Sequence, residues 1–79
     1  MSEPGSLEAV VRELLSAHVE VPQGADVPLE LPSLSLVVLA EELEARFGFV
    51  VAARELAPAN FGSLAALLGY CARKGASGH

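Results

Sequence analysis

The sequence predicts an all-α fold: a small bundle, with too little chain for two cores, built from three main helices, one short helix and a long first loop. Of the 79 residues, 52% are hydrophobic and the mean hydropathy is positive, which favours an ordered core. Only 5% are aromatic, so Leu, Val and Ala must fill that core, and Leu and Ala favour helices. We expect one domain over residues 6–74, between a flexible N-terminus (residues 1–5) and a flexible tail (residues 75–79).

The first helix is predicted to begin after Ser6, because a serine hydroxyl can cap the free N–H groups of a first turn. Glu8 then lies near the positive end of the helix dipole. Apolar residues follow at helical spacing: Leu7, Val10, Val11, Leu14 and Leu15. We expect this helix to end near His18, since β-branched residues and Pro22 come next.

Residues 19–32 show no helical period and contain three prolines, so they are predicted to form a long loop. Four apolar residues of this stretch have the spacing of loop anchors: Val21, Val27, Leu29 and Leu31. A loop of this length in a small domain is typical of a functional segment.

The second helix is predicted over residues 33–47, with Gly48 as the left-handed residue that ends it. At about 100° per residue, five residues form a core face: Leu36, Leu39, Ala40, Leu43 and Phe47. The opposite face carries Leu34, Val37, Val38, Glu41 and Ala45. A small domain needs only one apolar face to fold, so the second indicates a partner surface, on which Leu34 and Val38 should be exposed.

The remaining chain is predicted to form a short helix over residues 52–56, which Pro58 prevents from continuing. Residues 60–62 are expected to form a turn that brings Phe61 inward. Ser63 should cap a last helix that ends at Gly75 after two basic residues. Its core face is Leu64, Leu67, Leu68 and Cys71.

The charge favours protein partners. Ten acids against five bases give a net charge of −5, a poor match to nucleic acid and a good match to basic protein surfaces. The longest apolar run, Leu36–Ala40, is far shorter than the roughly 20 residues that span a membrane. The first residues lack the basic and apolar regions of an export signal, so we expect a cytoplasmic monomer.

Few residues are suited to catalysis or metal binding. A single cysteine excludes an internal disulfide and a multi-cysteine metal site. Cys71 lies on a core face, where a buried structural thiol is the commoner role. His18 and His79 are far apart in the sequence and form no catalytic constellation with it. We therefore expect a protein that is not an enzyme and holds no metal.

Two segments carry a resemblance to a known family. Ser33-Leu34 followed by Leu43-Glu44-Ala45-Arg46-Phe47-Gly48 looks like a serine-leucine pair followed by an L-E-x-x-F-G helix end. Pro58-Ala59-Asn60-Phe61-Gly62-Ser63-Leu64 looks like the segment before the last helix of the same family. From about Leu7 to Lys74 the chain resembles the acyl carrier protein family, which includes the peptidyl and aminoacyl carrier domains.

The resemblance implies a freestanding carrier protein that uses covalent 4′-phosphopantetheine. A phosphopantetheinyl transferase would attach this group from coenzyme A to Ser33, and its thiol would hold an acyl or aminoacyl group as a thioester. An acyl- or aminoacyl-loading ligase and downstream synthase or transferase enzymes of fatty acid, polyketide or nonribosomal peptide biosynthesis are the implied partners. The implied partner-binding residues are Leu34, Val37, Val38 and Glu41. A phosphate on Ser33 would meet the free N–H groups of a helix start.

The sequence also departs from the family pattern. Pro32 occupies the position where the family normally has an aspartate. Proline offers neither a carboxylate nor a backbone N–H, which favours the alternative of an unmodified, carrier-like interaction module. Ser33 could also serve only as an N-cap, and Ser35 is the competing acceptor, with Phe49 then at the helix end.

Three acids of the second helix, Glu41, Glu42 and Glu44, have two interpretations. In the family they would be charged recognition groups for partner enzymes. Acids on a helix more commonly form a solvated face without a partner, and this interpretation stays open at each of the three positions.

Overall fold

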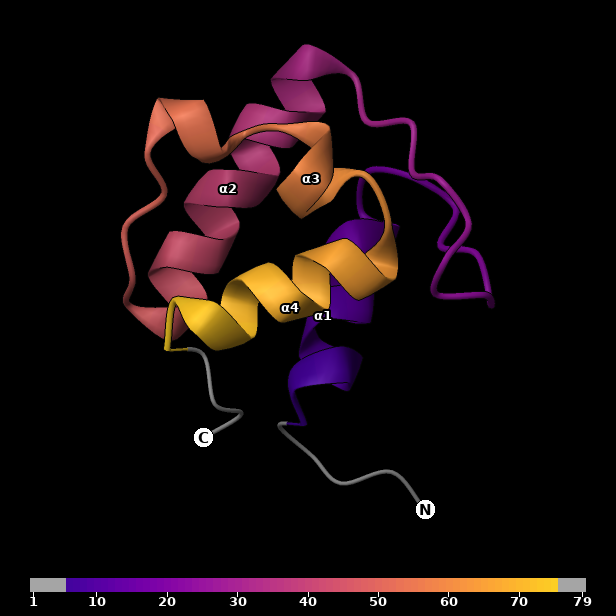
Figure 1. Cartoon of the computed structure of the whole chain (residues 1–79), viewed down its shortest axis with the longest axis horizontal. Helices are drawn as coiled ribbons and strands as arrows, with labels where there is room; N and C mark the ends of the chain where they lie inside the picture. The colour runs from indigo at the N-terminus through magenta and orange to yellow at the C-terminus, as the bar shows by residue number, and fades with distance from the viewer. Residues whose placement is uncertain (1–5, 76–79) are drawn as a thin grey trace.

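The computed structural model describes residues 6–75 and confirms the all-α fold with three main helices (Figure 1). Its elements are α1 (Leu7–Ser16), α2 (Ser33–Phe47), the 3₁₀ turn η1 (Ala53–Glu55), α3 (Pro58–Phe61) and α4 (Leu64–Arg73). Within residues 6–75 there is no strand, only one isolated antiparallel bridge between Pro28 and Ser63. The predicted flexible ends, residues 1–5 and most of 75–79, lie outside the described residues.

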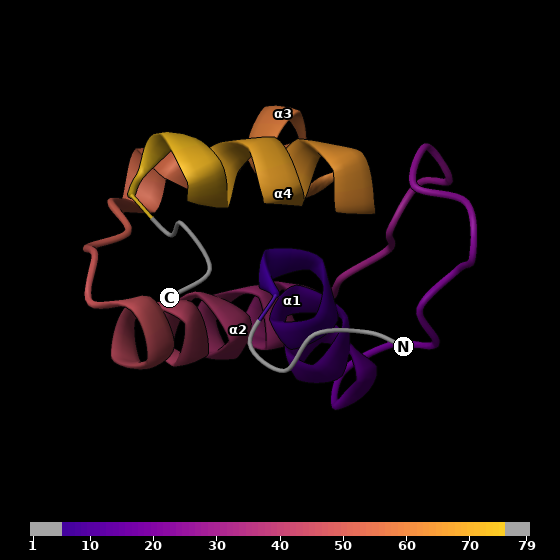
Figure 2. The ribbon, with the colours of Figure 1, turned by 90° about the horizontal axis from the view of Figure 1, so that it is seen from below.

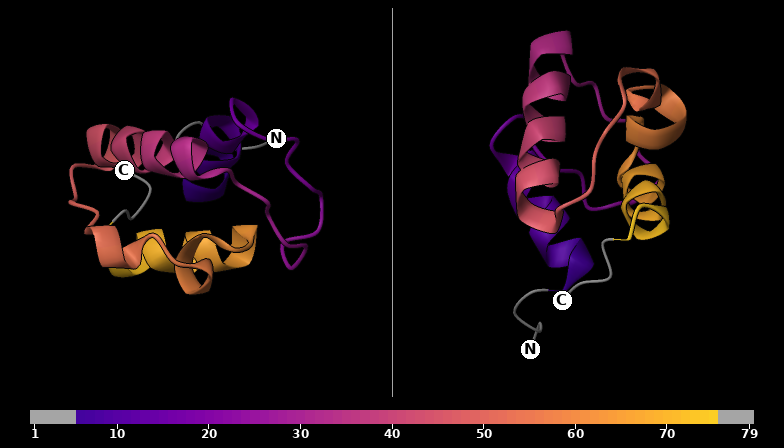
Figure 3. Two further views of the ribbon diagram at one scale, coloured as in Figure 1. Left: turned by 90° about the horizontal axis from the view of Figure 1, so that it is seen from above. Right: turned by 90° about the vertical axis from the view of Figure 1, so that its left-hand side faces the viewer.

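The helices form two layers (Figures 2 and 3). Helices α1 and α2 make one layer, and α3 and α4 make the other. Contacts between α1 and α4 join the layers, while α3 packs on α4 within its own layer. None of the helices in the described part of the chain is long and apolar enough to cross a membrane.

The core lies between the layers and is mainly aliphatic. Its fully buried side chains are Val11, Leu15, Leu39, Leu43, Leu64, Leu67 and Cys71. Burial of each such side chain contributes about 1.5–3 kcal/mol. The predicted core positions Leu14, Leu36, Phe47 and Leu68 pack against this core but are only partly buried.

The predicted helix ends are largely confirmed. The Ser6 hydroxyl accepts from Ala9 N at 3.2 Å, and the Ser63 hydroxyl accepts from Ala66 N at 3.1 Å. Gly48 has φ 84°, the left-handed conformation in which a side chain would be strained. Helix α1 ends at Ser16, two residues before the expected His18, because His18 N already bonds Leu15 O in a tight turn.

The segment around Pro58 differs from the prediction. The expected short helix over residues 52–56 is the three-residue turn η1, and the expected turn at residues 60–62 is largely helical, since α3 runs from Pro58 to Phe61. Proline suits the first position of a helix, because an N–H group at that position would have no partner within the helix. Pro58 therefore starts a helix here, and Phe61 still points inward with 3% exposure.

The first loop, residues 17–32, is fastened to the start of α4 and to α1. Leu29 N donates to Gly62 O at 2.7 Å, and Ala65 N donates to Ala25 O at 3.0 Å. From α1, Arg12 donates to the carbonyl oxygens of Pro22 and Gln23. These bonds order a loop that lacks secondary structure of its own.

The predicted loop anchors are partly right. Val21, Leu29 and Leu31 pack against the core as expected. Val27 does not: its side chain is 45% exposed, and the residue lies in a turn that is closed by the bond from Val27 N to Gly24 O. Ala25 takes the corresponding place against the core instead.

An aromatic cluster closes the opposite end of the bundle. The rings of Phe47 and Phe49 stack with centroids 6.0 Å apart, and Phe49 meets Tyr70 edge-on at 6.1 Å. Tyr70, which the helical pattern did not place in the core, also lies 5.3 Å from the Phe61 ring and is 2% exposed. The cluster ties the end of α2 to α4.

Candidate functional site

The candidate site is the start of α2, where the first loop ends (Figure 1). Pro32 occupies the N-cap position, and its carbonyl accepts from Leu36 N at 2.9 Å. Ser33 is the first residue of the helix, and no side-chain hydrogen bond caps α2. The interpretation of Ser33 as an N-cap is therefore wrong, since the cap position falls one residue earlier.

The first turn of α2 is suited to an anion. The N–H groups of Ser33, Leu34 and Ser35 precede the first i→i−4 bond and so have no partner within the helix. The dipole of this 15-residue helix is positive at the same end, and no acid lies in its first turn. An anionic group attached to Ser33 would meet free donors and no carboxylate within that turn.

The candidate partner-binding residues differ in exposure. Ser33 is exposed, Leu34 is 76% exposed and Val37 is 44% exposed, as a docking surface requires. Val38, expected to be exposed, is partly buried. Ser35, the competing acceptor, is partly buried as well. Exposure thus favours Ser33 over Ser35 as the residue that an enzyme could reach.

The acids of α2 have different roles. Glu41 is exposed, and no ion pair of the described residues includes it. Glu42 Oε1 lies 2.9 Å from His18 Nε2, which joins α2 to the end of α1. Glu44 accepts from Val51 N at 2.7 Å. Glu44 is therefore neither a free recognition group nor part of a solvated face, and Glu42 is engaged within the fold.

A small apolar pocket of about 130 Å³ lies beside the start of α2. Its lining comes from the first loop, from α2 and from α3 with the residues on either side of it: Leu29, Leu31, Leu36, Leu56, Ala57, Pro58, Phe61 and Gly62. The sequence did not predict this pocket, because Leu31 and Leu36 are some twenty residues away from Leu56. No local pattern joins these two segments.

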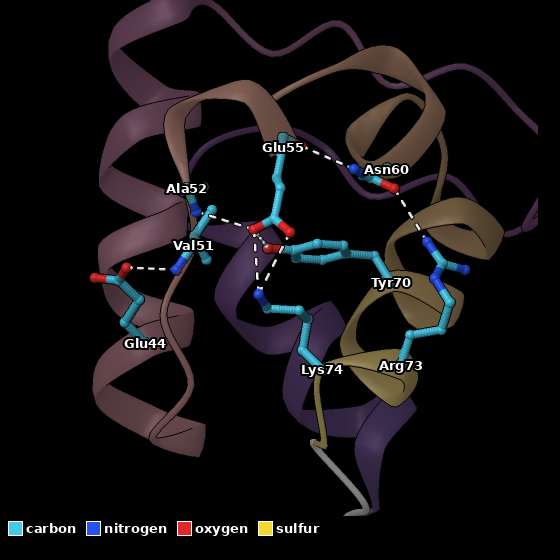
Figure 4. Close-up of polar contacts among 8 residues, drawn as sticks. All are labelled: Glu44, Val51, Ala52, Glu55, Asn60, Tyr70, Arg73 and Lys74. Atoms are coloured by element: carbon cyan, nitrogen blue, oxygen red, sulfur yellow. Dashed lines mark hydrogen bonds and ion pairs between the residues drawn. The ribbon is translucent and has the colours of Figure 1, made fainter.

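A polar cluster around Glu55 was also missed by sequence reasoning (Figure 4). The Glu55 carboxylate accepts from Ala52 N at 2.9 Å, from the Tyr70 hydroxyl at 2.9 Å and from Lys74 Nζ at 3.3 Å. The backbone bond from Ala52, followed by the Tyr70 bond, lowers the pKa of Glu55. Burial, followed by the bond to Glu55, raises the pKa of Tyr70. A glutamate three residues after Ala52 is the one local signal for this turn.

Two further reactive side chains, Cys71 and His18, are held within the fold. Cys71 is fully buried, and this burial raises the pKa of its thiol to about 11, which keeps it protonated and unreactive at neutral pH. His18 is bound to Glu42, and His79 lies outside the described residues. Among residues 6–75 there is no group of three His, Cys, Asp or Glu side chains that could hold a metal ion.

A scan against protein-family models and searches of the curated proteins and of the solved structures found no match to this chain.

Proposed function

We propose that this chain is a carrier protein, which holds acyl or aminoacyl groups as thioesters on 4′-phosphopantetheine attached to Ser33. The observation that carries the proposal is the exposed Ser33 at the start of a 15-residue helix. The resemblance of Ser33-Leu34 and of Leu43–Gly48 to the carrier motif supports it. In this proposal the domain catalyses nothing itself and presents its cargo to other enzymes.

The residues around Ser33 fit the phosphate of this group. The free N–H groups of the first turn and the helix dipole favour an anion there, and Pro32 leaves no competing side-chain cap. When bound, the group supplies a thiol that forms thioesters. The chain's own residues hold the phosphate end and present an exposed surface to enzymes.

The proposed docking surface is Leu34, Val37, Val38 and Glu41. Leu34 and Val37 supply the exposed apolar area, and Glu41 supplies a free negative charge. Val38 contributes only the part of its side chain that is not buried. A phosphopantetheinyl transferase, a loading ligase and downstream synthases or transferases would contact this surface. Apolar contact at the centre and charge at the edge is the usual composition of a protein interface.

Pro32 favours a second candidate, an unmodified carrier-like interaction module. The residue provides no carboxylate and no N–H beside Ser33. The exposed surface of α2 would then bind partners without any attached group. Both candidates use Leu34 and Val37, and they differ only in whether Ser33 is modified.

Intact-mass measurement separates the two candidates. The purified chain is incubated with coenzyme A and a broad-specificity phosphopantetheinyl transferase, beside the Ser33→Ala, Ser35→Ala and Pro32→Asp variants. The carrier proposal expects a phosphopantetheine mass gain in the wild type and in Ser35→Ala, and none in Ser33→Ala. A gain only in Pro32→Asp supports the unmodified module. A gain that persists in Ser33→Ala contradicts Ser33 as the site.

A further inference from the structure

The first loop forms a second apolar groove, of about 230 Å³, which shares only Leu29 with the lining of the pocket beside α2. Its apolar lining includes Val19, Val27, Pro28 and Leu29, and two acids, Glu20 and Glu30, line it as well. Val27 is 45% exposed although it is a large aliphatic residue. The groove therefore combines uncovered apolar area with two carboxylates.

The charge of this segment is entirely negative. Residues 19–32 contain Glu20, Asp26 and Glu30 and no Lys, Arg or His. All three acids are exposed, and the ion pairs found among residues 6–75 lie elsewhere. The basic side chain that contacts this loop, Arg12, is already bound to Glu8 and to two loop carbonyls. The carboxylates of the groove thus remain available to a partner.

The groove is also formed before any partner binds. Leu29 N donates to Gly62 O at 2.7 Å, and Arg12 donates to Pro22 O at 3.2 Å, so both sides of the groove are held by bonds to helices or helix ends. A loop ordered in this way loses little conformational entropy on binding. Preformed geometry, exposed apolar area and unpaired charge are the features of a docking site.

We propose that this groove docks a basic, apolar segment of a partner protein. An aliphatic side chain of that segment packs on Val27 and Pro28, and Lys or Arg side chains beside it pair with Glu20 and Glu30. Charge complementarity selects this occupant, since a second copy of the chain carries the same net charge of −5 and would be repelled. The proposal goes beyond the carrier function and does not depend on modification of Ser33.

An NMR titration tests the groove. The ¹⁵N-labelled full chain is titrated with the acetylated, amidated peptide Lys-Leu-Arg-Lys-Leu-Arg at low salt. We expect saturable shifts of the Glu20, Val27, Leu29 and Glu30 amides and an affinity that falls as salt is added. An analogue with Glu in place of every Lys and Arg should cause no such shifts.

Matched variants make the test specific. Glu30→Gln and Val27→Ser should each weaken peptide binding about two- to fivefold, as loss of one exposed charge or contact does. Glu13→Gln and Val50→Ser remove an exposed acid and an exposed valine elsewhere and should leave the affinity unchanged. Equal weakening by the control variants would overturn the proposal, because binding would then follow net charge or hydrophobicity alone.

Other occupants give other outcomes. Peptide shifts confined to residues 34–38, or no shifts at millimolar peptide, would overturn the groove as the docking site. A dimer in sedimentation velocity that Val27→Ser abolishes would identify a second copy as the occupant and also contradict the proposal. Repeating the titration with Ser33→Ala should give the same shifts, so failure of the carrier function and failure of the groove are distinguishable.

Discussion

The two long connections of this fold are fastened by different chemistry. The first loop, residues 17–32, is held mainly through backbone groups, with Leu29 N on Gly62 O and Ala25 O on Ala65 N. The second connection, residues 48–57, is held by carboxylates: Glu44 accepts from Val51 N, and Glu55 accepts from Ala52 N (Figure 4). Carboxylates therefore hold the second connection in place, whereas the acids of the first loop are left exposed.

This difference shows which acids are available for recognition. Glu44 and Glu55 are engaged by backbone N–H groups, so a partner would have to break those bonds to reach them. Glu20 and Glu30 face solvent and hold nothing in place. A net charge alone does not distinguish these two kinds of acid; their hydrogen bonds do.

The largest expected loss of stability comes from a substitution at Gly62, whose carbonyl oxygen holds the first loop through Leu29 N. A Cβ added at this position would clash with the backbone carbonyl oxygen of Pro58. Gly62→Ala should therefore lower the free energy of unfolding by about 1–3 kcal/mol, as measured by urea denaturation. Gly69→Ala, in the middle of α4, is the matched control and should stabilise the protein by about 0.5–1 kcal/mol. Wild-type stability in Gly62→Ala would contradict this account of the junction.

The next effect comes from the carboxylate that fastens the second connection. Glu55→Gln keeps the side-chain size but weakens the bonds from Ala52 N, the Tyr70 hydroxyl and Lys74. We expect a lower melting temperature and faster hydrogen exchange at the Ala52 amide. Glu30→Gln, in the first loop, should change neither. An equal fall in melting temperature for Glu55→Gln and Glu30→Gln would contradict the view that acids stabilise only the second connection.

The contribution of Glu55 to the stability of the fold should depend on pH. The folded-state pKa of Glu55 is below its ordinary value of 4.5, so the unfolded chain takes up a proton at higher pH than the folded chain. This contribution to stability is fully present above pH 4.5 and is lost as pH falls through the lower, folded-state pKa. Melting temperatures measured from pH 6 to pH 3 should therefore converge for wild type and Glu55→Gln. A difference that stays constant over this range would contradict the role of the charge.

The smallest expected effect concerns the side chain that fastens the first loop. Arg12→Ala removes the bonds to the Pro22 and Gln23 carbonyls and should cost about 0.5–1 kcal/mol in unfolding free energy. Hydrogen exchange should rise in residues 23–31. Glu8→Gln removes only the exposed Arg12–Glu8 pair and should leave exchange in the loop unchanged. Faster exchange in both variants would instead assign the effect to the ion pair.

The parts of the fold that depend on neighbouring residues could be predicted from the sequence. Ser6 and Ser63 cap their helices, and Gly48 ends α2, because each effect acts within one turn of the chain. The interpretation of Ser33 as an N-cap failed, since Pro32 is the N-cap residue and its carbonyl oxygen accepts the first bond of the helix. Reasoning from neighbouring residues also failed at Pro58, where a residue that stops one helix starts another.

The parts that depend on distant residues could not be predicted. Tyr70 is buried because Phe49, Phe61 and Glu55 surround it, and none of them is near it on the helical pattern of α4. At the candidate site, the exposure of Leu34 could be predicted from the sequence, but the partial burial of Val38 and the pocket beside α2 could not. Both features depend on the packing of segments that are far apart in the sequence.

No side-chain hydrogen bond caps the start of α2, and this has a consequence for modification of Ser33. A serine that capped its helix would lose its hydrogen bond when its hydroxyl was esterified, and about 1 kcal/mol of stability with it. Ser33 makes no such bond, so esterification of its hydroxyl would remove no hydrogen bond that caps the helix. An anionic group attached there would instead be favoured by the free N–H groups of the first turn, so modification would not weaken the start of α2.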